Sequence, residues 1–354
     1  MTYEQYQPLI EVTRGGMVES VHWGALAVVD VHGRLLASFG DPQASVFLRS
    51  SAKPFQALTL IELGGAERFG LSDREIAILC ASHSGTDEHA QTVAGIQAKI
   101  GATEGDLLCG VHPPMDEAAR VELLRRGEEP TPNRHNCSGK HTGMLAQARL
   151  RGFSFGHYLD FDHPVQQANL KAFSEMCGLP PQEVRLGIDG CSAPVFACPL
   201  YHAALGYARL ADPLAAGLAA ARAAACQRIS GAMIAHPEMV AGAGRFDTLL
   251  MQAGAGKILA KMGAEGYQGI GLLPGALGEG SAGIGIAIKI ADGDLNGRAV
   301  PLVTLEVLRQ LGALNRSQLA ALQAFDRRPM RNWRGLEVGE IRPIFKLARN
   351  GQPA

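Results

Sequence analysis

The sequence has no long apolar run, no excess of one charge and few aromatic residues. Its 33 basic residues nearly cancel its 34 acidic residues, which leaves a formal net charge of −1. Surfaces that bind nucleic acid are normally basic, so this balance argues against a nucleic-acid partner. No apolar run reaches the roughly 18 residues that a membrane span needs. The N-terminal segment lacks the basic and then apolar build of a signal peptide, and we therefore expect a cytoplasmic protein with no membrane partner.

The sequence also lacks any CxxC pair, although it contains seven cysteines. An odd number cannot all pair, and without an export signal the cysteines are expected to be reduced thiols. Glycine, in contrast, is abundant: 43 of 354 residues are glycine, well above the average of roughly 7%. The glycines cluster between apolar runs, which predicts many tight turns and close approaches of the backbone.

Strand-like and helix-like patterns occupy different parts of the chain. The segments predicted as strands are residues 10–14, 24–31, 34–39, 184–190, 258–261, 269–272, 281–290 and 338–345. The segments predicted as helices are residues 50–63, 72–81, 87–100, 137–150, 163–177, 205–229 (one or two helices), 299–311 and 317–324. A polar, proline-bearing surface excursion is expected around residues 113–114 and 128–136. We therefore predict a single α/β domain over residues 1–354, with a mixed, antiparallel sheet built from the N- and C-terminal segments and a mostly helical region over roughly 50–230.

The motif Ser50-x-x-Lys53 stands where a strand pattern changes to a helix pattern. One helical turn separates the two residues, so both side chains lie on the same face near the helix N-terminus. A lysine with a lowered pKa can remove the serine proton, and the N–H groups of a helix start suit an oxyanion. The structural alternative is that Ser50 caps the helix and Lys53 is a solvated residue of its first turn.

A second group of candidate residues comes from Cys137-Ser-Gly-Lys140-His141 and from Asp189-Gly-Cys191. Cys137 and His141 are four residues apart and therefore share one face of a helix. Two soft thiolates with one nitrogen ligand would suit zinc, with a position left open for water or substrate. Two alternatives remain open: a Cys–His nucleophile pair, and cysteines that pack as small buried hydrophobic side chains.

Two further segments place polar residues beside apolar patterns. Ser82-His83-Ser84-Gly85 ends an apolar helix pattern, and Lys261 precedes a glycine-bearing turn ahead of a strongly apolar strand. On their own, the first segment predicts a capping turn and the second predicts an ordinary turn between strands.

Together these segments resemble a known family. RSSAKPFQ, CASHSG, NCSGKHTGML, DGCSAP and KMGAEG occur in this order across almost the whole chain, and the set is similar to the asparaginase II family of the Rhizobium etli inducible type. Five motifs in one order are more specific than any one of them. The resemblance implies a fold like that of serine β-lactamases and glutaminases, which also begin with SxxK on a helix and finish with a lysine–glycine strand.

The resemblance also implies catalytic roles. Ser50 would be the nucleophile and Lys53 its general base, while Ser82 and Lys261 would form a second Ser–Lys couple that faces the first. Arg49 with Asp189 is the pair of counter-charges that we expect for the carboxylate and ammonium groups of a free amino acid.

The same resemblance implies a zinc site. Cys137, Lys140 and Cys191 would hold the ion, with water in the remaining position. A lysine ligand must be neutral, so the cation would have to lower the pKa of Lys140. His141 and Asp189 adjoin these residues and would orient the substrate or the metal shell.

The expected protein is a homodimeric L-asparaginase that releases aspartate and ammonia through a seryl intermediate. Three alternatives stand beside it. The first is a related amidohydrolase that acts on glutamine or another small amide, and the second is a non-catalytic amino-acid-binding protein on the same scaffold. The third is an amidase that uses Cys137 as its nucleophile.

Overall fold

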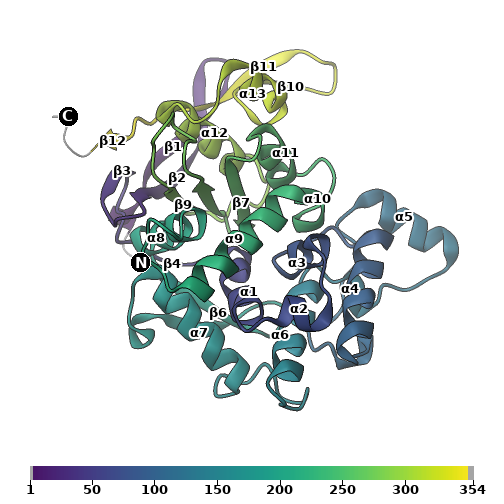
Figure 1. The fold of residues 1–354 in the computed structure, drawn as a ribbon. Helices are drawn as coiled ribbons and strands as arrows, with labels where there is room; N and C mark the ends of the chain where they lie inside the picture. Colours follow the sequence, from purple (N-terminus) through teal and green to yellow (C-terminus); the bar gives the residue numbers. More distant parts are fainter. Residues whose placement is uncertain (1–2, 350–354) are drawn as a thin grey trace. The chain divides into compact units, whose positions relative to one another are not determined.

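The computed structural model describes residues 3–349, and Figure 1 labels the helices and strands in chain order. The chain forms two compact units, each built from separate stretches of sequence. The first unit combines Met1–Ser51, Ala197–Ala216 and Leu249–Ala354, and the second combines Ala52–Phe196 and Gly217–Thr248. No helix among residues 3–349 is both long enough and apolar enough to cross a membrane.

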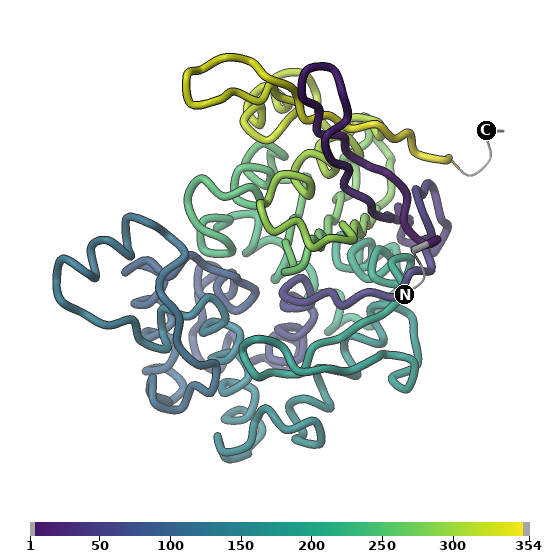
Figure 2. The backbone as a smooth tube through the Cα atoms, turned by 180° about the vertical axis from the view of Figure 1, so that it is seen from behind, coloured from purple at the N-terminus to yellow at the C-terminus, as the bar shows by residue number. Residues whose placement is uncertain are grey.

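A nine-stranded sheet forms the centre of the first unit. Its strands are β1 (Gln7–Arg14), β2 (Met17–Asp30), β3 (Leu35–Phe39), β7 (Ile258–Gly263), β8 (Tyr267–Leu272), β9 (Ile284–Ile290), β10 (Arg328–Arg331), β11 (Glu337–Pro343) and β12 (Ala348–Arg349). The main path is β10-β11-β1-β2-β9-β8-β7, and β3 pairs with both β2 and β12. All eight strand pairs described for this sheet are antiparallel. Figure 2 shows the N-terminal strands in purple beside the C-terminal hairpin in yellow, so the predicted sheet from both chain ends is confirmed.

The centre of this sheet is apolar because β2 and β9 bring branched side chains opposite one another. Leu26 lies opposite Ile288, and Val28 lies opposite Ile286. These four side chains are fully buried. Burial of such side chains is worth about 1.5–3 kcal/mol each, so this pair of strands contributes to the apolar core of the unit.

Helix α8 (Leu200–Ala211) packs closely on β2, β8 and β9. Glycines on one face of the strands allow this approach. A Cβ atom at Gly285 would lie 1.7 Å from the Ala204 carbonyl oxygen, and one at Gly269 would lie 2.3 Å from the Tyr207 ring. The glycine excess of the sequence therefore serves helix–sheet packing as well as turns. The unit also contains α12 (Ala299–Leu311) and α13 (Arg316–Ala321).

The second unit is a cluster of helices. Its helices are α1 (Lys53–Glu62), α2 (Gly65–Phe69), α3 (Asp73–Leu79), α4 (Asp87–Ile100), α5 (Glu117–Arg126), α6 (Ser138–Leu150), α7 (Pro164–Cys177), α9 (Ala220–Ala235) and α10 (Pro237–Val240). Helix α1 packs against α6, α7 and α9 (Figure 1). Every residue of α1 from Lys53 to Ile61 is buried, so its first turn is not the solvated one of the structural alternative.

Two types of helix start occur in the second unit. Helix α3 begins with a capping box between Ser72 and Glu75, and α4 begins with one between Thr86 and His89. Helices α1 and α6, in contrast, begin without a side-chain cap. The N-cap residues, Ala52 of α1 and Cys137 of α6, therefore accept no hydrogen bond from these helices through their side chains.

Three short strands lie at the points where the chain passes between the units. They are β4 (Ser45–Phe47), β5 (Arg185–Ile188) and β6 (Pro194–Pro199). Within the first unit, β4 pairs antiparallel with the end of β6, with Val46 opposite Cys198. The loop between β5 and β6 belongs to the second unit and carries Asp189 and Cys191.

Several elements were not predicted, among them the short elements β4, β6, β10, β12, α2 and α10, and three further differences concern longer helices. Helix α5 lies between the two stretches expected as a polar excursion, where no helix was predicted, because just one of its residues, Leu123, is buried and no apolar stripe marks it. The predicted helical stretch 205–229 is two helices, α8 and α9, which are separated at residues 212–219. Helix α11 (Phe246–Ala253), in which the chain returns to the first unit, was not predicted.

Candidate functional site

The SxxK motif lies at the start of α1. A short 3₁₀ turn, η2 (Arg49–Ala52), precedes the helix, and Arg49 in this turn has a left-handed backbone with φ of 51°. Such a conformation is uncommon for a residue other than glycine and is often found at functional sites. Ser50 is half-buried and is the next-to-last residue of the first unit in this stretch, while Lys53 opens α1 in the second.

Lys53 is almost completely buried, with 1% of its surface exposed. Its Nζ atom donates to the Ser82 hydroxyl at 3.0 Å, to the Asn136 carbonyl at 3.4 Å and to the Ala81 carbonyl. Burial lowers the pKa of Lys53, and the attraction of the nearby Cys137 sulfur only partly opposes it. A larger neutral fraction makes Lys53 a better proton acceptor than an exposed lysine.

Hydrogen bonds hold the backbone of Ser82 at both its N–H and its carbonyl group. Its N–H donates to the Val240 carbonyl at 2.9 Å, and its own carbonyl accepts from Arg245 Nη1 at 2.7 Å. Only 8% of its surface is exposed. The backbone of Ser82 is therefore fixed, and its hydroxyl stays within hydrogen-bond reach of Lys53.

Cys137, Lys140 and Cys191 form one buried cluster. Lys140 Nζ donates to the Cys191 sulfur at 2.8 Å, and the Cys191 and Cys137 side chains are hydrogen-bonded to one another. Gly139 allows the start of α6 to meet α3, because a Cβ atom there would lie 2.0 Å from the Ile78 carbonyl oxygen. The hydrogen bond between Lys140 and Cys191 joins residues that are 51 apart in the chain.

The charges in this cluster balance each other. The hydrogen bond from Cys191 and the electrostatic attraction of the nearby Lys53 and Lys140 side chains hold the pKa of Cys137 well below that of a free thiol. The hydrogen bond to Cys137, together with burial, raises the pKa of Cys191. Burial alone would lower the pKa of Lys140, but the sulfur atoms of Cys191 and Cys137 outweigh it, and the pKa lies above the ordinary value. The directions of these shifts favour a negative charge on Cys137 rather than on Cys191, and a positive charge on Lys140.

The donor atoms suit a soft or borderline cation. Two sulfur atoms and one nitrogen atom match the ligand types that zinc takes in proteins, although lysine is an unusual ligand. No group of three or more histidine, cysteine or acidic residues with metal-binding geometry occurs within residues 3–349. The set therefore fits zinc only if Lys140 loses its proton, because an ammonium group has no lone pair for a metal.

His83 is a site residue that the sequence did not identify. Its Nδ1 atom accepts from the Gly85 N–H at 3.2 Å, and its Nε2 atom lies 2.8 Å from the Ser138 hydroxyl. Because Ser138 donates its proton to the Asn133 carbonyl at 2.9 Å, His83 Nε2 is the donor to Ser138. His83 therefore ties the segment that carries Ser82 to the start of α6. Its position directly after Ser82 was the only signal in the sequence.

His141 and Asp189 lie close to Lys140. Burial holds the pKa of His141 well below its usual range, and the positive charge of Lys140 acts in the same direction. His141 Nδ1 lies 2.6 Å from the Tyr158 hydroxyl. Asp189 is half-buried, its N–H donates to the Ala193 carbonyl at 2.9 Å, and its charge contributes to the raised pKa of Lys140.

The first unit holds Arg49, Ser50 and Lys261. Arg49 is 4.0 Å from Glu265, and the buried Lys261 Nζ donates to the Met262 carbonyl at 2.8 Å. Ser51 is fully buried: its hydroxyl donates to the Lys261 carbonyl at 2.9 Å.

Tyr207 completes this network, because it donates to the Ser51 carbonyl at 2.8 Å and also lies 2.6 Å from the Ser51 hydroxyl. The Ser51 hydroxyl is thus committed to structure, and of the two adjacent serines Ser50 is the accessible one.

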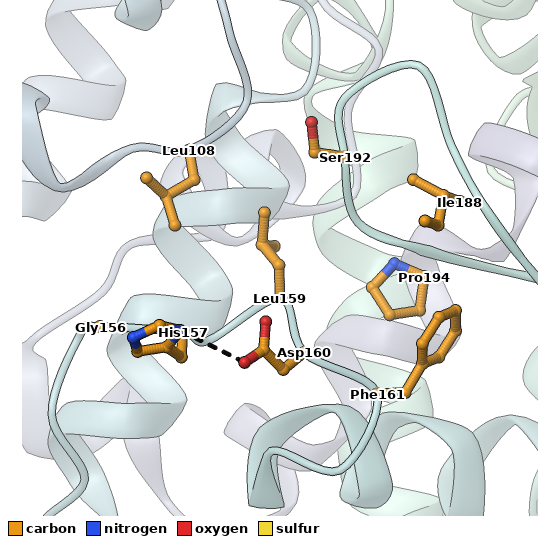
Figure 3. Close-up of a pocket in the computed structure, with 9 residues that line it drawn as sticks. All are labelled: Leu108, Gly156, His157, Leu159, Asp160, Phe161, Ile188, Ser192 and Pro194. Carbon is orange, nitrogen blue, oxygen red and sulfur yellow. Dashed lines mark ion pairs between the residues drawn. The ribbon is translucent and has the colours of Figure 1, made fainter.

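A surface pocket of about 650 Å³ in the second unit is shown in Figure 3. Mostly apolar residues line it, namely Leu108, Gly156, His157, Leu159, Asp160, Phe161, Ile188, Ser192 and Pro194. None of the predicted site residues is among them, although Ile188 and Ser192 flank the segment with Asp189 and Cys191. An apolar hollow of this kind does not suit a small zwitterion, so the amide site is not assigned to it.

The sequence profile of the family described as L-asparaginase II matches residues 10–343. The chain belongs to the L-asparaginase II family. Membership makes this L-asparaginase II chain an amidohydrolase whose substrate is a small amide. A search of curated protein sequences finds no match.

Solved structures that are similar to this L-asparaginase II chain include glutaminases. One is described as a probable glutaminase from Bacillus subtilis complexed with 6-diazo-5-oxo-L-norleucine, with 12% identity, 82% of this chain and 84% of that chain covered, and a TM-score of 0.39. Another is described as Mglu in its tris and glutamate form, with 16% identity, coverage of 82% and 59%, and a TM-score of 0.38.

In this L-asparaginase II chain, the second unit brings together most of the residues that the sequence identified. Lys53 meets Ser82, and Lys140 meets Cys191 beside Cys137. The contact between Lys53 and Ser82 joins residues that were expected to belong to two different Ser–Lys couples. The described geometry thus adds a direct link between the expected general base and the second serine.

Proposed function

We propose that the protein hydrolyses L-asparagine to L-aspartate and ammonia, as an L-asparaginase of the Rhizobium etli inducible type. The observation that carries this proposal is the environment of Lys53. It is a buried lysine with a lowered pKa, one helical turn after Ser50, and its Nζ atom is 3.0 Å from a second hydroxyl, that of Ser82. Membership in the L-asparaginase II family supports the amide as substrate.

The proposed reaction uses Ser50 as nucleophile. Neutral Lys53 accepts the Ser50 proton as the oxygen attacks the side-chain amide carbon of asparagine. The N–H groups at the uncapped start of α1 support the negative oxygen of the tetrahedral intermediate. Collapse of the intermediate breaks the C–N bond, and Lys53 returns the proton so that ammonia leaves. Water then attacks the seryl ester and gives a proton to Lys53. Lys53 returns this proton to the Ser50 oxygen as the ester C–O bond breaks, which releases aspartate and restores neutral Lys53 and the Ser50 hydroxyl.

Ser82 and Lys261 have supporting roles in this proposal. Ser82 is hydrogen-bonded to Lys53 and can relay its proton, which is consistent with the fixed backbone of Ser82. Lys261 completes the second couple by resemblance to the family. Its buried position on β7 is consistent with a residue that is held in one place.

We propose Arg49, Asp189 and His141 as substrate-binding residues. A free amino acid carries a carboxylate and an ammonium group, and the site must offer a charge to each. Arg49 supplies a guanidinium for the carboxylate, and Asp189 supplies a carboxylate for the ammonium group. His141 supplies an uncharged hydrogen-bonding group, since burial keeps it neutral.

We also propose that Cys137, Lys140 and Cys191 hold a zinc ion. Their sulfur and nitrogen donors are in mutual contact, which supports the proposal. A bound zinc ion would polarise or position the substrate as a Lewis acid. Lys140 and the Cys191 thiol would each have to lose a proton for the ion to bind, so uptake of zinc should release protons and weaken as the pH falls.

The test is ammonia release from L-asparagine, L-glutamine and their D-isomers by the wild-type protein, with and without a chelator. We expect L-asparagine to be hydrolysed fastest, and the Ser50→Ala variant to lose this activity while keeping its fold. Retained turnover in Ser50→Ala would place the nucleophile elsewhere. A faster reaction with L-glutamine would favour the alternative amidohydrolase, and binding of asparagine without ammonia release would favour an amino-acid-binding protein.

One observation favours a second candidate mechanism, in which Cys137 is the nucleophile. Its lowered pKa favours the thiolate, which is the reactive form of cysteine. This mechanism predicts that an alkylating reagent abolishes activity in chelator-treated protein and that Cys137→Ser is inactive while Ser50→Ala is active. The Ser50 mechanism predicts that Ser50→Ala is inactive, whatever activity Cys137→Ser keeps.

We further propose that the protein is a homodimer, on the strength of the family resemblance alone. Sedimentation equilibrium gives the mass in solution directly. A mass of one chain, 37.4 kDa, across the micromolar range would contradict the proposal.

A further inference from the structure

Tyr158 is a buried residue that contacts His141 and is not among the proposed catalytic, substrate-binding or zinc-binding residues. Its side chain is fully buried, and its ring meets the His141 ring edge to face, with centroids 5.7 Å apart and an interplanar angle of 85°. The Tyr158 hydroxyl lies 2.6 Å from His141 Nδ1 and accepts from the Leu108 N–H at 2.9 Å. The hydroxyl therefore stands between a fixed donor and the histidine ring.

The donors and acceptors in the hydrogen-bonded series Leu108–Tyr158–His141 can be assigned from their partners. The Leu108 N–H occupies an acceptor position of the Tyr158 oxygen, so the Tyr158 O–H needs an acceptor of its own. His141 Nδ1 is the acceptor within reach. Burial raises the pKa of Tyr158, which is consistent with a phenol that keeps its proton. His141 thus receives a hydrogen bond at Nδ1, and in the neutral ring the proton then sits on Nε2.

The Nε2 atom of His141 is buried and, among residues 3–349, has no hydrogen-bond partner. A buried N–H without an acceptor costs free energy, and such groups are rare in folded proteins. The lone pair of the ring is already used at Nδ1, so Nε2 presents a proton rather than a lone pair. His141 can therefore donate to an oxygen atom but does not ligate a metal in this tautomer.

We propose that Tyr158 is a positioning residue that fixes His141 as the Nε2–H tautomer, and that this N–H binds an oxygen atom of the amino-acid substrate. The oxygen belongs to a carboxylate or an amide, since both are strong acceptors. The identity of this acceptor rests on the proposed function, whereas the tautomer does not. The proposal also separates His141 from the metal site: it serves the substrate, and Cys137, Lys140 and Cys191 serve the ion.

The segment around Tyr158 is built to hold the hydroxyl in place. The Tyr158 carbonyl accepts from Gln166 Nε2 at 2.7 Å, which ties the segment to α7. The residues on either side, His157 and Leu159, line the surface pocket of Figure 3, and His157 has a left-handed backbone with φ of 60°. Tyr158 is therefore the buried residue of a surface segment, and its ring has little freedom to leave His141.

The tautomer can be measured directly. The ¹⁵N shifts of histidine-labelled, metal-free protein distinguish a protonated ring nitrogen from an acceptor nitrogen, and the His141→Gln spectrum assigns the His141 signals. We expect His141 to carry its proton on Nε2 in the wild type. In Tyr158→Phe we expect a mixture of tautomers. A wild-type ring protonated on Nδ1, or an unchanged tautomer in Tyr158→Phe, would overturn the proposal, whether or not the protein hydrolyses asparagine.

The binding role is tested by the split between KM and kcat. Glutamine places an N–H near the Nε2 position and asparagine near the Nδ1 position. We therefore expect His141→Gln to stay within about threefold of the wild-type KM and His141→Asn to raise KM about tenfold. Tyr158→Phe should raise KM about fivefold with a smaller change in kcat. Equal KM values in His141→Gln and His141→Asn would contradict the binding role.

Two controls complete the experiment. Tyr6→Phe is the control, because Tyr6 is a buried tyrosine of the first unit whose hydroxyl, unlike that of Tyr158, has no hydrogen-bond partner among residues 3–349; we expect unchanged kinetics. Asparagine and its α-amide distinguish the two kinds of oxygen. If His141 binds the carboxylate, the effect of His141→Asn should shrink with the α-amide. If it binds the side-chain amide oxygen, the effect should be the same for both substrates.

Discussion

The starts of α1 and α6 look alike and behave differently. Each helix begins without a side-chain cap, and each carries a buried lysine in its first turn, Lys53 in α1 and Lys140 in α6. Burial lowers the pKa of Lys53, whereas two sulfur atoms raise the pKa of Lys140 in spite of burial. Burial thus disfavours the charged form of both lysines, and the neighbouring atoms decide whether each pKa is lowered or raised.

The difference assigns the two lysines to different chemistry. Lys53 donates to oxygen atoms of Ala81, Ser82 and Asn136, and it is the lysine whose pKa burial lowers. Lys140 donates to Cys191 and balances the Cys137 thiolate. One helical unit therefore holds both a candidate base and a charge-balanced thiol cluster.

The largest expected effect is the loss of the base. We predict that Lys53→Met lowers kcat/KM for asparagine by about 1,000-fold, since a general base contributes roughly 10² to 10⁴. Lys99→Met is a control, because Lys99 is a partly exposed lysine on α4 that pairs with Glu75. Steady-state ammonia release measures both variants. Activity of Lys53→Met within tenfold of the wild type would remove Lys53 from the role of base.

Substitution of Lys140 should cost more unfolding free energy than substitution of Lys53. In metal-free protein, Lys140→Met leaves the Cys137 thiolate without its ammonium partner, and breaking a buried pair costs about 3 kcal/mol. Lys53→Met removes a charge whose burial is unfavourable, so we expect a smaller loss of unfolding free energy. Urea titration measures both. Equal losses in the two variants would mean that the sulfur atoms do not stabilise the Lys140 ammonium.

The contributions of Lys140 and Lys53 to the unfolding free energy should change with pH in opposite directions. The pKa of Lys140 is raised on folding, so its contribution is fully present below the ordinary value of 10.5 and is lost as the pH rises through the folded value. The pKa of Lys53 is lowered on folding. Between its folded value and 10.5 the unfolded chain binds more protons, so this group makes stability rise with pH.

Removal of one sulfur atom breaks the cluster in a different way. Cys191→Ser replaces a thiol that contacts Lys140 and Cys137. We predict that zinc affinity falls by roughly 100-fold, because a hydroxyl is a poor zinc ligand. Competition with a chromophoric chelator measures the affinity. Cys226→Ser is the matched control, since Cys226 is a buried thiol on α9 with a pKa of about 12 that lies outside the cluster. Equal affinities in wild type and Cys191→Ser would contradict the proposed zinc site.

The smallest expected effect comes from Asp189. Its charge helps to raise the pKa of Lys140, after the two sulfur atoms. We predict that Asp189→Asn lowers the pKa of Lys140 by less than about one unit and leaves that of Lys53 unchanged. Titration of ¹³Cε-labelled lysine by NMR measures both groups. An equal shift in both pKa values would indicate a general change in the fold rather than a local charge effect.

The parts of the fold that the sequence predicted are those with local patterns. The strands at both chain ends follow β-branched runs, and α4 and α7 follow apolar periodicity with clear caps. Helix α5 could not be predicted because Leu123 is its only buried residue, so the sequence shows no apolar stripe. The site was predicted through five motifs, not through geometry.

The contacts inside the site could not be predicted, because they join distant positions. His83 meets Ser138 across 55 residues, and Lys140 meets Cys191 across 51. Tyr158 stands in a segment with no motif, and its contact with His141 exists only in the folded chain. The raised pKa of Lys140 could not be predicted either, because it depends on the Cys191 side chain, which belongs to another motif.

Lys53 and Lys140 are both buried, and their surroundings shift the two pKa values in opposite directions from that of an ordinary lysine. One NMR titration of metal-free, ¹³Cε-lysine-labelled protein measures both pKa values, with Lys53→Arg and Lys140→Arg providing the assignments. We expect Lys53 to lose its proton below the ordinary value of 10.5 and Lys140 above it. Titration of Lys53 above that value, or of Lys140 below it, would show that burial and the sulfur atoms do not set these two pKa values.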